Sequence, residues 1–276
     1  MSAAGDLAPA ALRAAIRRGD WTGPTAGAVR GYLQCNLAIL PEGFARGFES
    51  WCQANPGVCP LVAVGKPGDP RLPSLGGDID LRTDLPGYSV FRGGRPGGHV
   101  LAIGDLWRDD FVAFAFGCSF SFEGVLLGEG VDLRYLARGE REAIYRSSLE
   151  TTPVDGFSGP LIVSMRPLRP VDAIRAIEVT ARYPLVHGAP VHIGKPEAIR
   201  VDPDRPMETL GGISVADDEL PLFWACGVTP QLAIRRAAPD ICITHRSAHM
   251  LVTDIPVDTL RDRTPEDGLT PGSGGS

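Results

Sequence analysis

Hydrophobic residues along the chain occur in short runs whose spacing alternates between that of strands and that of helices. The runs 31–40 and 59–64 have the character of buried strands, although the first would also suit a short buried helix. Residues 42–53 place four apolar side chains on one helical face, namely Phe44, Phe48, Trp51 and Cys52. We therefore predict a helix over 42–53 that ends before Asn55-Pro56.

Turn residues separate the remaining apolar runs. The stretch 65–85 is rich in Gly, Pro and Asp, which predicts a long loop, and 88–100 is expected to form a hairpin around its Gly-rich turn. Residues 161–194 have the order strand, helix, strand that is typical of a βαβ or split βαβ unit. Two further short strands are expected at 241–245 and 250–255.

The apolar run 111–117 is followed by polar residues. Asp109-Asp110 favours a helix start before this run, so a helix is expected to continue through it to Gly117. A second helix is then expected to begin with Ser119 or Ser121 as its N-cap and to end at 128–130, before another strand.

The alternation of strands and helices indicates an α/β fold with a layered mixed sheet and flanking helices. A smaller α+β subdomain of the split βαβ kind is expected within it, over 157–215. We expect 1–276 to form one continuous globular unit whose last residues, 263–276, are a disordered tail, because they lack an apolar pattern.

Composition adds little to this fold but narrows the function. The net charge of −6 argues against a nucleic-acid surface, which needs clustered cations. Lysine occurs only at Lys66 and Lys195, so nearly all cations are arginines, which suit bidentate capture of a carboxylate or phosphate. No apolar run approaches the roughly 20 residues that span a bilayer. We expect a cytoplasmic protein with six reduced, scattered cysteines and no membrane partner; a homo-oligomer remains open.

The first polar junction is GCSFSFEG, residues 117–124. A helix that begins at Ser119 or Ser121 would present backbone N–H groups to an anion, with Cys118 beside them. In the alternative reading the hydroxyls only cap the helix, and Glu123 complements its dipole.

The second junction is CGVTPQ, residues 226–231, where a strand turns into a helix with Thr229 as the expected N-cap and Pro230 as its first residue. Ligands of α/β sheets gather at such turns, although a plain capping turn is equally compatible with the residues. Cys226 would be either a nucleophile activated by the helix start or a buried inert thiol.

Arginines and histidines supply the remaining candidates. Arg166 and Arg82 either pair with a protein carboxylate or receive one from a ligand, and for Arg82 the nearby Asp80 and Asp84 make internal pairing the default. His187 and His245 follow apolar segments and are candidate general acids or bases. His245 and His249 have the i, i+4 spacing that holds a metal on a helix, but they lie between two strand-like runs.

P-loop, GxSxG and strand-flanked GxGxxG motifs are absent from the sequence. The chain instead carries, in order, GYLQCNLAILP, CPLVAVGKPGDP, DIDLRTDLPGYSVFRGG, WRDDFVAFAFGCSFSFE, GFSGPLIVSMRP, YPLVHGAPVHIG, PLFWACGVTPQ and ITHRSAHMLVTD. With these motifs it resembles the YcsI-like family, which is named for hydro-lyases and related to part of the mitochondrial D-glutamate cyclase. The resemblance covers about residues 25–255. It implies an enzyme that removes water from a small carboxylate-bearing substrate, by elimination or by lactam formation from an amino-dicarboxylic acid.

A hydro-lyase needs a base for the proton α to a carboxylate, an acid for the departing hydroxide, and donors that hold the carboxylate. His187 or His245 is the expected base and Glu123, among phenylalanines, the expected acid, with Cys118 as a further catalytic candidate. The substrate-binding candidates are Arg82, Asp84, Ser119, Ser121, Arg166, Cys226, Gly227 and Thr229. No cofactor is expected. The alternatives are a non-catalytic organic-acid-binding module, or a metal-assisted lyase or hydrolase that uses His245 and His249.

Overall fold

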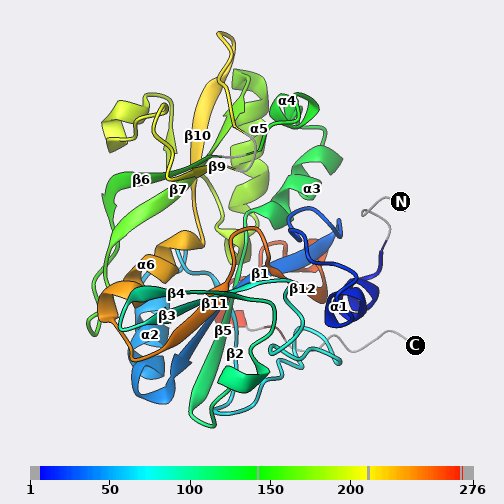
Figure 1. Ribbon diagram of the computed structural model, residues 1–276. Helices are drawn as coiled ribbons and strands as arrows, with labels where there is room; N and C mark the ends of the chain where they lie inside the picture. Colours follow the sequence, from blue (N-terminus) through cyan, green and yellow to red (C-terminus); the bar gives the residue numbers. More distant parts are fainter. Residues whose placement is uncertain (1–6, 142, 210–211, 268, 270–276) are drawn as a thin grey trace.

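Two antiparallel sheets, one above the other in Figure 1, form the frame of the protein in a computed structural model that describes residues 7–141, 143–209, 212–267 and 269. The first sheet has seven strands in the order β2-β5-β1-β11-β3-β4, with β12 also paired to β1. The second has five, in the order β8-β10-β7-β6-β9. The expected α/β class holds in this coarse form, but the expectation of a mixed sheet is wrong, because every neighbouring pair of strands is antiparallel.

The strands of the first sheet are β1 (Tyr32–Pro41), β2 (Leu61–Val64), β3 (Tyr88–Arg92), β4 (Arg95–Val100), β5 (Phe111–Gly117), β11 (Cys242–His245) and β12 (Leu251–Pro256). Those of the second are β6 (Ala143–Glu150), β7 (Pro160–Leu168), β8 (His192–Ile193), β9 (Glu208–Thr209) and β10 (Leu220–Ala225). The α-helices are α1 (Pro9–Arg17), α2 (Glu42–Ala54), α3 (Phe120–Gly128), α4 (Arg134–Ala137), α5 (Pro170–Ala181) and α6 (Val228–Ala237). Short 3₁₀ turns complete the described chain at Gly104–Leu106, Pro184–Val186, Pro196–Ile199, Val257–Leu260 and Pro265–Asp267.

The segment 161–194 forms the split βαβ arrangement that the sequence predicted. Strands β7 and β8 both pair antiparallel with β10, which lies between them, so β7 and β8 are parallel to each other. Helix α5 makes the crossover between them. The hairpin of β3 and β4 is also confirmed, with a turn at residues 93–94.

The prediction of a helix through 111–117 is wrong, because this segment is the strand β5, between β1 and β2. Its two faces enter two different cores. Phe111 and Ala113 face the large core that continues to the second sheet, whereas Phe114 and Phe116 pack against α2 and α6. A strand buried on both faces is apolar throughout, and such a run cannot be distinguished from a buried helix by periodicity alone.

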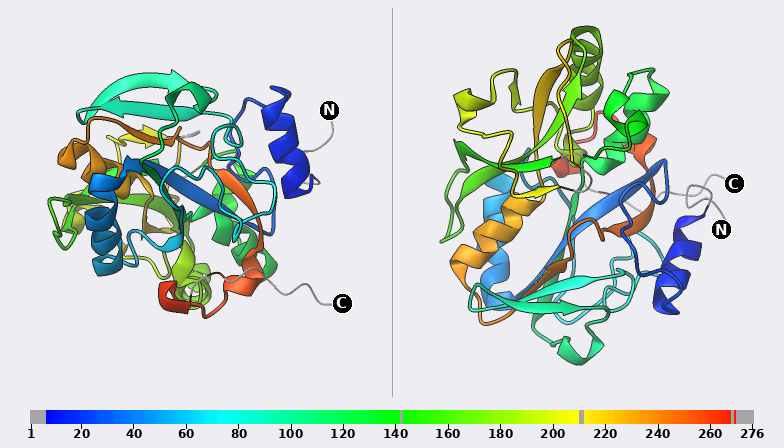
Figure 2. Two further views of the ribbon diagram at one scale, coloured as in Figure 1. Left: turned by 90° about the horizontal axis from the view of Figure 1, so that it is seen from below. Right: turned by 45° about the horizontal axis from the view of Figure 1, so that its top comes forward.

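Helices α2 and α6 lie side by side on one face of the first sheet (Figures 1 and 2). The predicted helix over 42–53 is confirmed as α2, and its Phe48 packs edge-on against Phe114 of β5, with ring centroids 5.0 Å apart. Helix α6 begins at Val228, with Gly227 in the cap position, so the expected cap at Thr229 is wrong by two residues. The short helix α4 follows α3, where a strand was expected.

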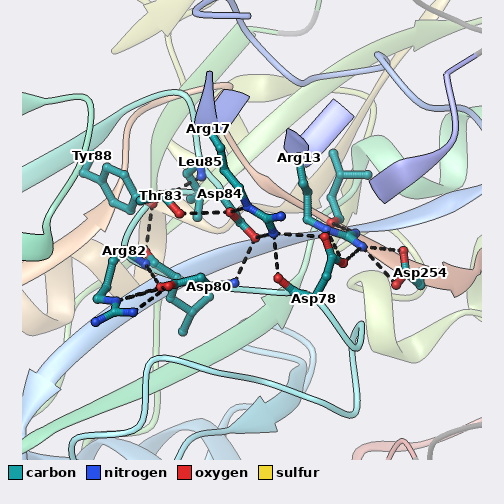
Figure 3. Close-up of polar contacts among 12 residues, drawn as sticks. Arg13, Arg17, Asp78, Asp80, Arg82, Thr83, Asp84, Leu85, Tyr88 and Asp254 are labelled. Atoms are coloured by element: carbon teal, nitrogen blue, oxygen red, sulfur yellow. Dashed lines mark hydrogen bonds and ion pairs between the residues drawn. The ribbon is translucent and has the colours of Figure 1, made fainter. Parts of the chain in front are cut away.

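The predicted long loop 65–85 is held against helix α1 by a network of ion pairs, drawn in Figure 3. Arg13, which is fully buried, pairs with Asp78 and Asp254, and Arg17 pairs with Asp78 and Asp84. These contacts explain how a segment rich in Gly, Pro and Asp adopts one conformation without regular structure.

The end of the chain is ordered where the structure describes it. Residues Pro265–Asp267 form a 3₁₀ turn, and the Leu269 side chain packs against the large core, which differs from the tail expected over 263–276. The rest of that tail, 268 and 270–276, lies outside the described residues. Over the described ranges, each helix is too short or too polar to cross a membrane.

Candidate functional site

Two strand-to-helix turns meet at one pocket of about 250 Å³, which we call the turn pocket. The turn from β5 into α3 contributes Cys118 and Ser119, and the turn from β10 into α6 contributes Cys226 and Gly227. His245, the last residue of β11, lines the same pocket. The sequence therefore identified five residues that the fold brings together from three separate segments.

Asn36 of β1 ties the two turns to each other, and sequence analysis missed it. Its Nδ2 donates to the carbonyl oxygen of Gly117 at 2.9 Å, and its side chain lies against Gly227 so closely that a Cβ there would be 2.2 Å from Nδ2. A Cβ on Gly117 would lie 1.8 Å from the Leu185 carbonyl oxygen. Both turns therefore require glycine. The signal in the sequence was a pair of amides, Gln34 and Asn36, inside an otherwise apolar strand.

His245 is neutral at physiological pH. Its Nδ1 lies 3.1 Å from the backbone nitrogen of Leu37 and 3.4 Å from the Leu37 carbonyl oxygen; the shorter contact, in which Nδ1 accepts from the N–H, favours the tautomer with the ring proton on Nε2. Burial lowers the pKa of His245 to about 4, and the neighbouring His249 acts in the same direction. With this pKa His245 is a weak base, but its Nε2–H can donate a hydrogen bond or proton to a ligand oxygen.

His187 lies close behind the turns but does not line the turn pocket. Burial lowers its pKa to about 4, and the positive charge of Arg166 acts in the same direction. Its Nδ1 is 3.1 Å from the carbonyl oxygen of Gly57, and its buried Nε2 meets no hydrogen-bond partner within the described part of the chain. The structure thus separates the two histidines that the sequence proposed as alternative bases.

Arg166 forms the polar support of the first turn. This fully buried guanidinium donates from Nε to Glu123 Oε1 at 2.8 Å and from its terminal nitrogens to Ser164 Oγ at 3.0 Å and Ser119 Oγ at 3.3 Å. Tyr135 donates to the same Oε1 of Glu123 at 3.0 Å. Because Glu123 already balances its charge, Arg166 acts on the turn pocket through the Ser119 hydroxyl.

Glu123 and Ser121 line a second pocket, of about 120 Å³, which we call the Glu123 pocket. Phe120 lines both pockets, and the chain of contacts Glu123–Arg166–Ser119 joins them. The candidates of the first junction are therefore divided between two pockets. Thr229 lines neither pocket, because its hydroxyl accepts from the backbone N–H of Ile162 at 2.9 Å.

Arg82 and Asp84 lie apart from both pockets, in the loop network of Figure 3. Arg82 pairs with Asp80 at 2.7 Å, which is the internal pairing that the sequence favoured. Asp84 is buried and accepts from Arg17 Nε at 2.6 Å. Asp84 is thus occupied in holding the loop to α1, and Asp80 in pairing with Arg82 within the loop.

The helical histidine pair that would hold a metal does not form. His245 ends a strand, His249 follows in the turn before β12, and its Nδ1 lies 2.6 Å from the carbonyl oxygen of Ser247. Across the described ranges, no group of three or more His, Cys, Asp or Glu side chains is arranged to hold a metal ion.

The fold and the site define an α/β protein with a small pocket where residues of two antiparallel sheets meet. The model of the D-glutamate cyclase family matches residues 112–254. A protein of Rhizobium johnstonii is 50% identical over 248 residues, covering 90% of this chain and 92% of the relative. One of Verminephrobacter eiseniae is 51% identical over 243 residues, covering 88% and 89%. Both carry the name "Putative hydro-lyase".

The chain belongs to the D-glutamate cyclase family, which confirms the family resemblance drawn from its motifs. Among solved structures, a nitrogen repressor-like protein of Methanococcus jannaschii covers 88% of this chain and 96% of its own. Its TM-score of 0.35 and identity of 11% are too low to support any argument.

Proposed function

We propose that this protein is a lyase that removes water from a small carboxylate-bearing substrate in the turn pocket. The reaction is either elimination from a hydroxy acid or closure of an amino-dicarboxylic acid to a lactam. One observation carries the proposal: two helix starts, two thiols and a neutral histidine line a single pocket of about 250 Å³. Membership of the D-glutamate cyclase family and the name of the relatives support the same reaction class.

The substrate carboxylate is held at the starts of α3 and α6. The first bonded amide of α6 is that of Thr229, which donates to the Cys226 carbonyl, so the amides of Gly227 and Val228 precede it. Amides at a helix start and the positive end of its dipole favour an anion. The Ser119 hydroxyl, fixed by Arg166, adds a donor from the other turn. The guanidinium of Arg235, which also lines the pocket, adds positive charge near the carboxylate.

The proton chemistry is divided between His245 and Cys118. The neutral ring of His245 donates the Nε2 proton to the departing oxygen, since its pKa of about 4 makes it unsuitable as a base at neutral pH. A thiol at a helix start ionises more easily than an ordinary one, and Cys118 stands just before α3. In elimination the Cys118 thiolate takes the proton α to the carboxylate, the C–O bond breaks, and water leaves with the His245 Nε2 proton. The Cys118 thiol then returns its proton to the imidazolate, which restores both groups.

Lactam closure uses the same groups. The Cys118 thiolate accepts a proton from the substrate ammonium, and the amine attacks the distal carboxyl carbon. The C–O bond then breaks as the nitrogen loses a second proton, and the oxygen leaves as water with these two protons, which Cys118 and His245 relay to it. Glu123 is a positioning residue in both reactions, because it holds Arg166, which holds Ser119. This differs from the acid role expected for Glu123 from the sequence.

The test is a screen of hydroxy- and amino-dicarboxylic acids for loss of one water, followed by mass spectrometry. We expect turnover of at least one acid, a fall of about 100-fold or more with H245N and C118S, and unchanged turnover with H99N, whose ring bonds Ser89 on the β3–β4 hairpin. Tight calorimetric binding of an acid that is recovered unaltered would instead support the non-catalytic organic-acid-binding module. Full turnover by H245N or C118S would refute the assigned roles.

A further inference from the structure

We propose that the Glu123 pocket is a second binding site, for a small zwitterion that carries an ammonium and a carboxylate. The pocket lies between the start of α3 and the segment that leads into β1, which run next to each other in Figures 1 and 2. Its volume of about 120 Å³ is sufficient for a ligand of the size of a small amino acid. Binding here does not depend on the reaction proposed for the turn pocket.

A buried acceptor without a donor marks the inner end of this pocket. Gln34 lines it and is only 2% exposed. The backbone N–H of Gln34 donates to Ser121 Oγ at 3.0 Å, but its buried side-chain Oε1 has no hydrogen-bond partner in the described part of the chain. A buried polar atom left without a partner costs free energy, so a ligand that brings an N–H donor is favoured at this point.

Glu123 supplies the negative charge. Its Oε1 receives the hydrogen bonds of both Arg166 and Tyr135, whereas its Oε2 accepts none from the described residues. The Glu123 side chain is 12% exposed and lines the same pocket as Gln34. One charged and one neutral acceptor on a small pocket suit an ammonium, which has three donors and no acceptor.

Two arginines give the outer end of the pocket the opposite charge. Arg30 and Arg141 both line it and are exposed. Neither forms an ion pair with any carboxylate of the described chain, and the Arg141 guanidinium donates to the backbone oxygen of its neighbour Glu140, at 2.8 Å. A guanidinium without a protein carboxylate is suited to receive one from a ligand. The buried acceptors Gln34 and Glu123 thus match the ammonium of an α-amino acid, and the exposed Arg30 and Arg141 match its carboxylate.

The site is connected to the turn pocket through Arg166. An ammonium on Glu123 would compete with Arg166 for the same carboxylate, and Arg166 also holds Ser119 in the turn pocket. We therefore expect a ligand in the Glu123 pocket to alter binding in the turn pocket, with a coupling of a few-fold or more.

The experiment is isothermal titration of the whole protein with the monocarboxylic amino acids alanine, 2-aminobutyrate and valine, which carry no hydroxyl group, each as both enantiomers. These probes lack the second carboxylate of the proposed substrates, so their binding is tested separately from turnover. We expect at least one to bind, with propionate and ethylamine at least ten-fold weaker. Q34L and R141A should each weaken binding about ten-fold or more, whereas H245N, at the turn pocket, should leave it unchanged.

Loss of binding in a variant is meaningful only if that variant folds. Arg141 is exposed, so R141A is expected to fold, and the thermal unfolding midpoint of Q34L checks that variant. Wild-type affinity in both Q34L and R141A, or equal affinity for propionate alone, would overturn the proposal. Binding lost in H245N but kept in Q34L would also overturn it, by placing the ligand in the turn pocket. The absence of binding by all six probes would overturn it as well.

Discussion

Glu123→Gln tests the buried ion pair on which the first turn depends. Arg166 is fully buried and the Glu123 side chain is 12% exposed, so the pair is held almost away from water. Glutamine keeps an acceptor for Tyr135 and Arg166 but removes the charge, which leaves the guanidinium uncompensated among Phe122 and Trp224. Breaking a buried pair from one side costs about 3–5 kcal/mol.

The companion variant is Arg166→Met combined with Glu123→Gln. Removing both charges leaves no buried ion, and replacing a complete buried pair with uncharged side chains of similar volume is often close to neutral. We therefore expect the double variant to be more stable than the sum of the single variants predicts, with an interaction free energy of about 1–3 kcal/mol. The exposed pair Arg134–Asp218, at 2.9 Å, gives the control: Asp218→Asn should change stability by about 1 kcal/mol or less.

Urea unfolding followed by circular dichroism measures these free energies. With a slope of about 3 kcal/mol per molar urea, a loss of about 3–5 kcal/mol moves the midpoint down by about 1 M or more. A shift for Glu123→Gln no larger than that for Asp218→Asn would refute the reasoning. Strict additivity of the two single variants would refute it too, because the pair would then contribute as two independent side chains.

Three further predictions concern the turns, the histidines and the thiols. Gly227→Ala should lower the free energy of unfolding in urea by about 1–3 kcal/mol, because the new Cβ would lie 2.2 Å from Asn36 Nδ2. Asn36→Ser should restore part of that stability, and the absence of any rescue would contradict the contact. Burial holds the pKa of His187 and of His245 at about 4, below the 6.5 of an unfolded chain, so their contribution is present above pH 6.5 and is lost as the pH falls toward 4. The free energy of unfolding should fall by about 3 kcal/mol per histidine between about pH 6.5 and pH 4. His187→Gln should make this dependence on pH less steep, and a dependence as steep as that of the wild type would contradict the assigned pKa shift. In native thiol titration Cys118 and Cys226, which line the turn pocket, should react before the other four cysteines, which are buried away from it; simultaneous reaction of all six would contradict this order.

Local signals in the sequence were enough for several elements. The helical face of residues 42–53 predicted α2, and the Gly-rich turn predicted the β3–β4 hairpin. The order of runs over 161–194 predicted the split βαβ unit. Each of these depends on residues near one another along the chain, so periodicity and turn chemistry were sufficient. The motifs were sufficient for the family as well.

Long-range pairing determined what local signals could not. The run 111–117 became a strand because β1 and β2 lie on either side of it, and the apolar residues alone did not reveal those neighbours. The sequence left open whether Arg166 pairs with a carboxylate of the protein or of a ligand, and it pairs with Glu123, 43 positions away. Asn36 acquired its place at the pocket from contacts with two distant turns.

The charge state of the histidines at the site also depends on contacts between distant segments. A histidine in a sequence carries an ordinary pKa, and burial beneath distant strands is what makes His245 neutral. Residue types and their spacing along this chain were thus enough to name the family and five residues of the turn pocket. The division into two pockets and the partner of each charge arise from contacts between segments far apart, because electrostatic energy depends on distance in space.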